Sequence, residues 1–195
     1  MITDNPFLGP TWEPFGQVCI ALIEDLKRGH MFQVQSYGHA FGLSPDTSPF
    51  VQAICHDGSI QLECSSNLQV EPPLTESQYA ELAFYGWELP EVNVDEYREN
   101  HDGNPNFCRY FDATVEASVI AEFILTTLVG VFGLTEEDFF GFSTKAEADK
   151  VDSLNKLGRL AYSSGNPDRV IFAMPGKHLD MLAFPTPTDL AGPDS

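Results

Sequence analysis

The residues that could act as nucleophiles or metal ligands are few and scattered along the chain. The cysteines and histidines stand at Cys19, Cys55, Cys64, Cys108, His30, His39, His56, His101 and His178. No two histidines have the spacing of a helical metal-binding pair. Cys55 and His56 are adjacent on a predicted strand, where neighbouring side chains point to opposite faces, so these two residues cannot hold one metal ion.

Two weaker arrangements stay open. His101 and Cys108 have six residues between them, which fits either a ligand pair or two side chains in contact with solvent. The second open arrangement is a cysteine nucleophile with a histidine partner that only the fold brings together. Against it, Cys19, Cys55 and Cys64 fall on apolar faces, which is typical of unreactive core thiols. The motifs of serine hydrolases, P-loops and dinucleotide-binding folds are absent, so we predict no catalytic residue, no cofactor and no metal site.

Carboxylates crowd one segment of the chain, residues 88–102. They are Glu88, Glu91, Asp95, Glu96, Glu99 and Asp102. Such a cluster invites Ca²⁺, but it lacks the alternating oxygen ligands and the glycine of an EF-hand loop, so we predict a solvated acidic loop. Glu122, inside an apolar stretch, fits a buried functional carboxylate, a rim position or one half of a pair.

The composition indicates an acidic globular protein. The 195 residues include 29 acidic and 10 basic side chains, a net charge of −19, and 15 phenylalanines. The aromatic content rules out global disorder, and the charge excludes sequence-independent nucleic-acid binding and disfavours anionic membranes. The first 142 residues carry −18 of this charge and the last 53 carry −1. We therefore predict a domain over 1–142 and a C-terminal extension over 143–195 that packs on the same domain.

No targeting segment is expected. The N-terminus lacks the basic and apolar regions of a signal peptide. The most apolar stretch, residues 117–134, is about as long as a membrane span, but it contains Glu122 and is flanked by acids. We predict a buried helix there, a cytoplasmic location, no membrane partner and four reduced cysteines.

The clearest local pattern is a β-hairpin over residues 50–64. Asp57 and Gly58 suit a type I′ turn, and pairing outward from them sets Val51 opposite Cys64. One face of the hairpin is then apolar and the other polar. The apolar Phe50 and Ile54 interrupt the polar face, and they fit either an exposed binding strip or a position beneath the loop 38–49.

The remaining elements predict an α+β fold with helices packed on one face of an antiparallel sheet. Thr11 is the expected N-cap of the first helix, and Asp112 or Thr114 that of the apolar helix. The expected order over residues 1–142 is α-β-β-β-α-β-α, followed by a C-terminal helix, a hairpin and a Pro-rich tail. The expected ranges are helix 11–28, strand 31–37, hairpin 50–64, helix 75–86, loop 88–106, strand 107–111, a helix ending at 133, helix 145–162 and hairpin 170–184.

Several motifs between residues 49 and 142 resemble the TY-Chap family, actinobacterial domains related to type III secretion chaperones and YbjN proteins. The motifs are a strand-turn-strand ending in Ser66-Asn67, the L-x-x-x-G-W-x-x-P of Leu82, Gly86, Trp87 and Pro90, the N-F-x-R-x-F of Asn106, Phe107, Arg109 and Phe111, and the V-F-G-L of Val131 to Leu134. The chain departs from the family pattern in an enlarged acidic loop at 91–105 and in its nearly neutral C-terminal segment.

The resemblance implies a peptide- or protein-binding module and not an enzyme. Its chaperone relatives are small, acidic, often dimeric cytosolic proteins that hold an extended partner segment along apolar grooves, so a homodimer is one expected state. The resemblance does not name the residues that bind the partner. We expect Trp87 to dock a helix end and Arg109 to pair with a carboxylate.

Two other function classes also fit the sequence. An acidic immunity- or antitoxin-like inhibitor of a basic protein would explain the charge, and its binding would depend strongly on salt. An enzyme whose site is assembled only in the fold would show a deep pocket with convergent polar groups and carboxylates of shifted pKa.

Overall fold

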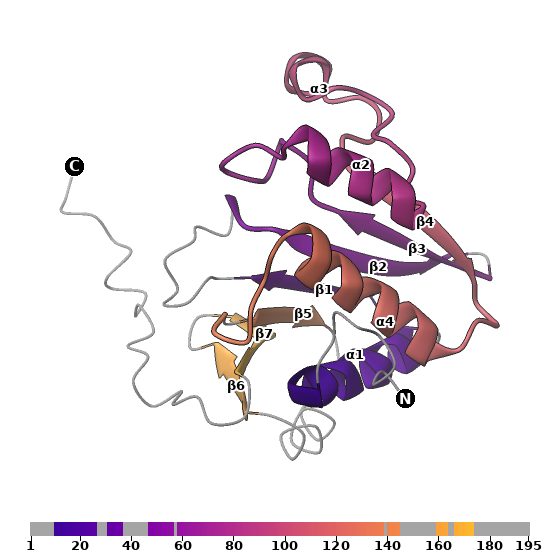
Figure 1. The fold of residues 1–195 in the computed structure, drawn as a ribbon. Helices are drawn as coiled ribbons and strands as arrows, with labels where there is room; N and C mark the ends of the chain where they lie inside the picture. The colour runs from indigo at the N-terminus through magenta and orange to yellow at the C-terminus, as the bar shows by residue number, and fades with distance from the viewer. Residues whose placement is uncertain are drawn as a thin grey trace.

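An antiparallel sheet and the helices that cover one of its faces make up the fold (Figure 1). The computed structural model describes residues 10–26, 31–36, 47–56, 58–138, 140–144, 159–163 and 166–173. The α+β class predicted from the sequence is confirmed. The predicted order α-β-β-β-α-β-α is also present, with one further short helix inserted in it.

The helices and strands follow one another in this order, labelled as in Figure 1. They are the 3₁₀ turn η2 (Pro10–Trp12), α1 (Glu13–Leu26), β1 (Met31–Ser36), β2 (Phe50–His56), β3 (Ser59–Cys64), α2 (Glu76–Tyr85), α3 (Val94–Asn100), β4 (Phe107–Asp112), α4 (Ala117–Thr126), the π-helical turn η4 (Thr127–Val131), β5 (Phe140–Thr144), β6 (Arg159–Ser163) and β7 (Asn166–Ala173).

All described strands belong to one seven-stranded sheet, in the order β4-β3-β2-β1-β5-β7-β6. Each strand pairs antiparallel with its neighbours. β5 runs through the predicted domain boundary near Ser143, and β6 and β7, from the C-terminal segment, extend the same sheet beyond it. The division of the chain at this point stays a prediction.

The structure corrects the prediction for the C-terminal segment. Residues 159–162, expected at the end of a helix over 145–162, belong to β6, and the rest of the predicted range lies outside the described residues. β7 pairs with β6 and β5, whereas the sequence predicts a hairpin between 170–174 and 178–184. The residues of that predicted second strand are outside the described part of the chain. An alternating strand pattern does not specify its partner, so the pairing was open to error.

The β2–β3 hairpin has the predicted register, with Val51 opposite Cys64 and His56 opposite Ser59. Gly58 has φ of +80°, the left-handed conformation that the predicted turn requires. Phe50 is buried at 7 % exposure and Ile54 is half-buried, so Phe50 does not form an exposed binding strip.

The core lies between the sheet and the pair of helices α1 and α4, which pack against each other (Figure 1). Trp12, Phe15 and Phe140 form an aromatic cluster with ring centroids 4.6–5.9 Å apart. The apolar stretch that begins at Ala117 turns most of its large side chains toward this core, as predicted for a buried helix. Among the described residues, no helix is long and apolar enough to span a membrane.

Two predicted helix caps are wrong. Thr11 lies in the 3₁₀ turn before α1, and its hydroxyl donates to the carboxylate of Glu136. The carboxylate of Asp112 accepts hydrogen bonds from the amide and the hydroxyl of Thr114 at 2.8 and 2.7 Å, within the turn that precedes α4. The N-cap of α4 is Glu116, which makes no side-chain capping bond. Thr11 and Asp112 both have side chains that can cap a helix. In the structure, these side chains form a tertiary contact and a turn contact instead.

α2 is joined to the sheet and to α4 through two side chains of the family motifs. The indole Nε1 of Trp87 donates to Thr127 Oγ1 at 3.1 Å, so this residue docks the end of α2 as expected. The Arg109 guanidinium lies over the rings of Phe111 and Phe123, at 5.5 and 5.9 Å from their centroids. Its Nη1 donates to the Gly86 carbonyl at 2.9 Å. The described residues place no carboxylate within salt-bridge distance of Arg109, which corrects the expected pairing.

We expect Gly86→Ala to destabilise the protein by about 1–3 kcal/mol in urea unfolding. Gly86 has φ of +88°, and a Cβ there would lie 2.8 Å from Arg109 Nη1. Gly133→Ala is the matched control, because its φ is +68° but no atom lies within 4 Å of its Cβ position. A loss at Gly86 no larger than the loss at Gly133 would show that the contact with Arg109 contributes nothing.

Candidate functional site

Within the described part of the chain, the side chains that could do chemistry do not come together. Cys55 and His56 lie on opposite faces of β2, as predicted. His101 is the exposed C-cap of α3, whereas Cys108 is buried on β4. All four cysteines are free thiols, and the described residues contain no group of three or more His, Cys, Asp or Glu side chains arranged for a metal ion.

The acidic segment, residues 88–106, contains a helix that the sequence analysis did not predict. The Asn93 side chain caps α3 by accepting a hydrogen bond from the Glu96 amide at 2.8 Å, and His101 ends the helix with φ of 54°. The six carboxylates predicted to be solvated are all exposed. An Asn N-cap and acids in the first turn favour a helix start, and these signals were present in the sequence.

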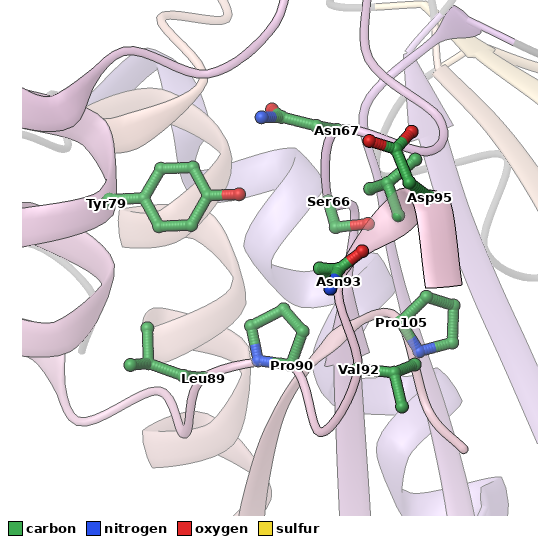
Figure 2. Close-up of a pocket in the computed structure, with 10 residues that line it drawn as sticks. Ser66, Asn67, Tyr79, Leu89, Pro90, Val92, Asn93, Asp95 and Pro105 are labelled. Carbon is green, nitrogen blue, oxygen red and sulfur yellow. The ribbon is translucent and has the colours of Figure 1, made fainter. Parts of the chain in front are cut away.

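A hollow of about 600 Å³ lies between α2, the end of β3 and the acidic segment. Its lining is Ser66, Asn67, Tyr79, Leu89, Pro90, Val92, Asn93, Val94, Asp95 and Pro105. Figure 2 shows the Tyr79 ring reaching into it from one side, Leu89 and Pro90 along one edge, and the Asp95 carboxylate across from Tyr79. Apolar rings and chains with a few polar groups at the edge are the usual composition of a ligand pocket. We call this hollow the apolar pocket.

Backbone hydrogen bonds close the acidic segment at its base. Glu88 and Cys108 form a two-way bridge, with N···O distances of 2.7 and 3.2 Å. Further out, the Glu91 amide donates to the Asn104 carbonyl at 3.0 Å, and the Asn104 amide donates to the Glu91 carboxylate at 3.1 Å. The segment therefore leaves and rejoins the fold at one place, and its first and last residues form a wall of the apolar pocket.

One carboxylate on the open face of the sheet holds this base in place. Glu63 on β3 accepts hydrogen bonds from the amide groups of Gln52 at 2.6 Å and Gln61 at 2.8 Å. It also accepts from Asn104 at 3.0 Å and Asn106 at 3.3 Å, at the end of the acidic segment. Four amide donors satisfy the carboxylate without a basic side chain, and hydrogen bonds to an ionised group are stronger than neutral ones.

The thiol next to this network is not activated. Burial, with a smaller contribution from Glu63, raises the pKa of Cys108 to about 11. The neighbouring donors are the Asn104 amide, 3.2 Å from Cys108 Sγ, and the more distant Gln61 amide. Burial also raises the pKa of Cys19 and of Cys64. Because the thiolate is the nucleophile, these environments oppose cysteine catalysis.

Comparison with known protein families identifies the chain. The family model described as T3SS (YopN, CesT) and YbjN peptide-binding chaperone 3, or TY-Chap3, matches residues 7–146. The chain belongs to the TY-Chap3 family. Comparisons with curated proteins and with solved structures found no match.

Membership of the TY-Chap3 family confirms the resemblance seen in the motifs, and the family's description is that of a peptide-binding chaperone. The matched range contains every residue that lines the apolar pocket. The sequence analysis named no binding residue, although Pro90 and Ser66-Asn67 belong to the motifs that carried the resemblance. In the sequence, the only indication of the pocket was that Leu89 directly precedes Pro90 of the family motif.

We expect Cys55, which is half-buried, to be the first cysteine of this TY-Chap3 protein to react with iodoacetamide. With its pKa at about 11, Cys108 has about one thiolate in a thousand at pH 8, so its alkylation should be slow and should rise about tenfold per pH unit below that pKa. Mass spectrometry of the digested protein measures both rates. Fast labelling of Cys108 at neutral pH would contradict the structure and revive the cysteine-enzyme hypothesis.

We expect Glu63→Ala to loosen the acidic segment and to lower the free energy of unfolding by about 1–3 kcal/mol, because several amide donors lose their acceptor. Hydrogen exchange should increase in residues 89–106 more than in β2. Glu116→Ala is the control, because it removes one exposed carboxylate outside this network. Equal exchange profiles for the two variants would show that Glu63 does not hold the base of the segment.

Proposed function

We propose that this protein is a non-enzymatic binding module that holds an extended segment of a partner protein in the apolar pocket. The family is a peptide-binding chaperone family, which supports the class of ligand. The observation that carries the choice of site is the hollow of about 600 Å³. It is lined by the aromatic, proline and aliphatic side chains that suit an inserted apolar residue.

The exposure of the lining residues supports this site. Leu89 is 61 % exposed and lies beside other apolar groups of the lining, so a partner can reach its side chain. Tyr79 is half-buried, and burial raises the pKa of its hydroxyl, so it would remain a neutral hydrogen-bond donor for a partner's carbonyl. An extended segment has unpaired backbone carbonyls, so a donor beside an apolar pocket matches what it presents.

The walls of the pocket are held from several directions. The Asn67 carboxamide oxygen accepts from the Leu74 amide at 2.7 Å, and Thr75 and Gln78 form a capping box at the start of α2. The opposite wall is fixed through the bridge between Glu88 and Cys108. A site formed before binding loses less conformational freedom when a flexible segment enters it.

The proposal includes a protein or peptide partner and a cytoplasmic location. The net charge of −19 opposes association with nucleic acid, and reduced thiols suit the four free cysteines. An enzyme would require a cleft with activated groups. Among the described residues that line the apolar pocket, the only ionisable side chains are Tyr79 and Asp95.

We expect Leu89→Asp to weaken binding of a partner peptide at least tenfold, because it places a charge in the apolar pocket. The peptides come from a random library displayed on phage and selected on the full-length chain, and fluorescence anisotropy measures their affinity. Both Leu89 and the control Val119, on α4, are large exposed hydrophobic residues, at 61 and 51 %, so Val119→Asp makes the same chemical change outside the pocket.

Unfolding of both variants in urea shows whether either change acts through stability. Failure to select any peptide would overturn the proposed function. Peptides that bind the two variants equally well would overturn the choice of the apolar pocket.

A further inference from the structure

Two polar side chains that line the apolar pocket have donor groups that the described part of the chain does not use. The Ser66 hydroxyl and the Asn93 carboxamide both form hydrogen bonds with neighbouring residues. The Asn67 oxygen accepts from the Leu74 amide at 2.7 Å, but Asn67 Nδ2 donates to no described group. The Tyr79 hydroxyl also has no hydrogen bond with a described residue.

These two donors, the Tyr79 hydroxyl and Asn67 Nδ2, are held in place before any ligand arrives. Figure 2 shows the hydroxyl pointing into the pocket, the Asn67 carboxamide above it in this view, and the Asp95 carboxylate across from both. An edge contact with Phe107, with ring centroids 5.1 Å apart, fixes the Tyr79 ring. The hydrogen bond to Leu74 orients the Asn67 carboxamide. Positioned donors lose little freedom when they bind an acceptor.

The chemistry of the pocket matches a neutral carbonyl oxygen. Such an oxygen has two lone pairs, so it can accept from both donors. A carboxylate would place its charge in a pocket that is lined by the Asp95 carboxylate and by no basic side chain, on a chain of net charge −19. Backbone carbonyls inside a helix are already bonded within the helix, whereas those of an extended segment are open. The pocket therefore favours the backbone of an extended segment.

We propose that Tyr79 and Asn67 together bind one backbone carbonyl of the partner segment, beside the bulky apolar residue that fills the apolar pocket. This inference rests on the proposed function and adds the two residues that set its specificity. The pocket selects a segment for its extended backbone as well as for an apolar side chain. The contact tolerates different sequences around the apolar residue, because every residue has a backbone carbonyl.

Substitutions that remove only the donors test the proposal. Tyr79→Phe removes the hydroxyl and keeps the ring, and Asn67→Asp keeps an oxygen for the Leu74 amide but removes the N–H donors. Tyr85→Phe and Asn100→Asp are the matched controls, because they make the same chemical changes in residues that do not line the apolar pocket. Tyr85 lies on α2 with Tyr79, and Asn100 is exposed at the end of α3. Urea unfolding compares the stability of the four variants.

We expect Tyr79→Phe and Asn67→Asp each to weaken binding of a peptide selected from the random library about three- to tenfold relative to its control. In a second series, the backbone carbonyls of the peptide are converted one at a time to thioamides, whose sulfur is a weaker hydrogen-bond acceptor. One position should weaken binding to the unaltered protein by a similar factor. That loss should disappear in the Tyr79→Phe variant, where the contact is already missing.

Three results would overturn the inference. The first is a loss in the two variants no larger than in their controls, or a thioamide series in which no position is coupled to Tyr79. The second is tighter binding of a thioamide peptide, because a thioamide N–H is a stronger donor and the Tyr79 hydroxyl would then be an acceptor. The third is stronger binding of peptides that end in a free carboxylate at the apolar residue than of their C-terminal amides, which would identify a carboxylate as the ligand.

These results are distinguishable from failure of the proposed function. In each of the three cases, loss of binding in the Leu89→Asp variant would still support the apolar pocket. If no peptide is selected at all, the proposed function and this inference both fail.

Discussion

Two backbone hydrogen bonds between Glu88 and Cys108 close the acidic segment on itself, and the candidate site depends on that closure. They are the innermost of the contacts that return this segment to the sheet, and the hydrogen bonds between Glu91 and Asn104 lie further out. The amide side chains that follow α3 add the carboxylate of Glu63 as a second anchor, on the strand next to β4. Backbone pairing thus sets the position of the segment, and a charged hydrogen-bond acceptor holds it against the sheet. The apolar pocket lies along the segment that this arrangement holds.

A half-buried cation, Arg109, with no acidic partner among the described residues is the other unusual feature of this region. The guanidinium of Arg109 contacts the faces of two aromatic rings, and it donates a hydrogen bond to the carbonyl of Gly86, the residue that ends α2. Desolvation of a charge is costly, and ring contacts with one hydrogen bond offset part of that cost. In return, one side chain connects α2, β4 and α4. The residue that accepts its hydrogen bond, Gly86, lies between Tyr79 on α2 and Leu89, both of which line the apolar pocket.

The carboxylates that make the protein acidic occupy two different environments in the structure. The carboxylates of the acidic segment are exposed, while Glu63 is partly buried and saturated by amides. Exposed charge helps to keep a protein with an exposed apolar pocket in solution, and it attracts segments of opposite charge. Both effects suit a module that must remain free to accept a partner. Neither effect needs a catalytic group.

Local rules were sufficient for much of this fold. The register of the β2–β3 hairpin, the capping box of α2 and the burial of the helix from Ala117 follow from alternation, turn chemistry and apolar spacing, because these act between residues close in sequence. Local rules failed at Thr11, at Asp112 and in strand β6. The two side chains bond to Glu136 and to Thr114, and the backbone of β6 pairs with β7. Only the tertiary structure decided that Glu63 holds Asn104 and Asn106, and that Tyr79, Leu89 and Pro90 line one hollow. These contacts join segments up to about 40 residues apart, and no spacing in the sequence encodes such a distance.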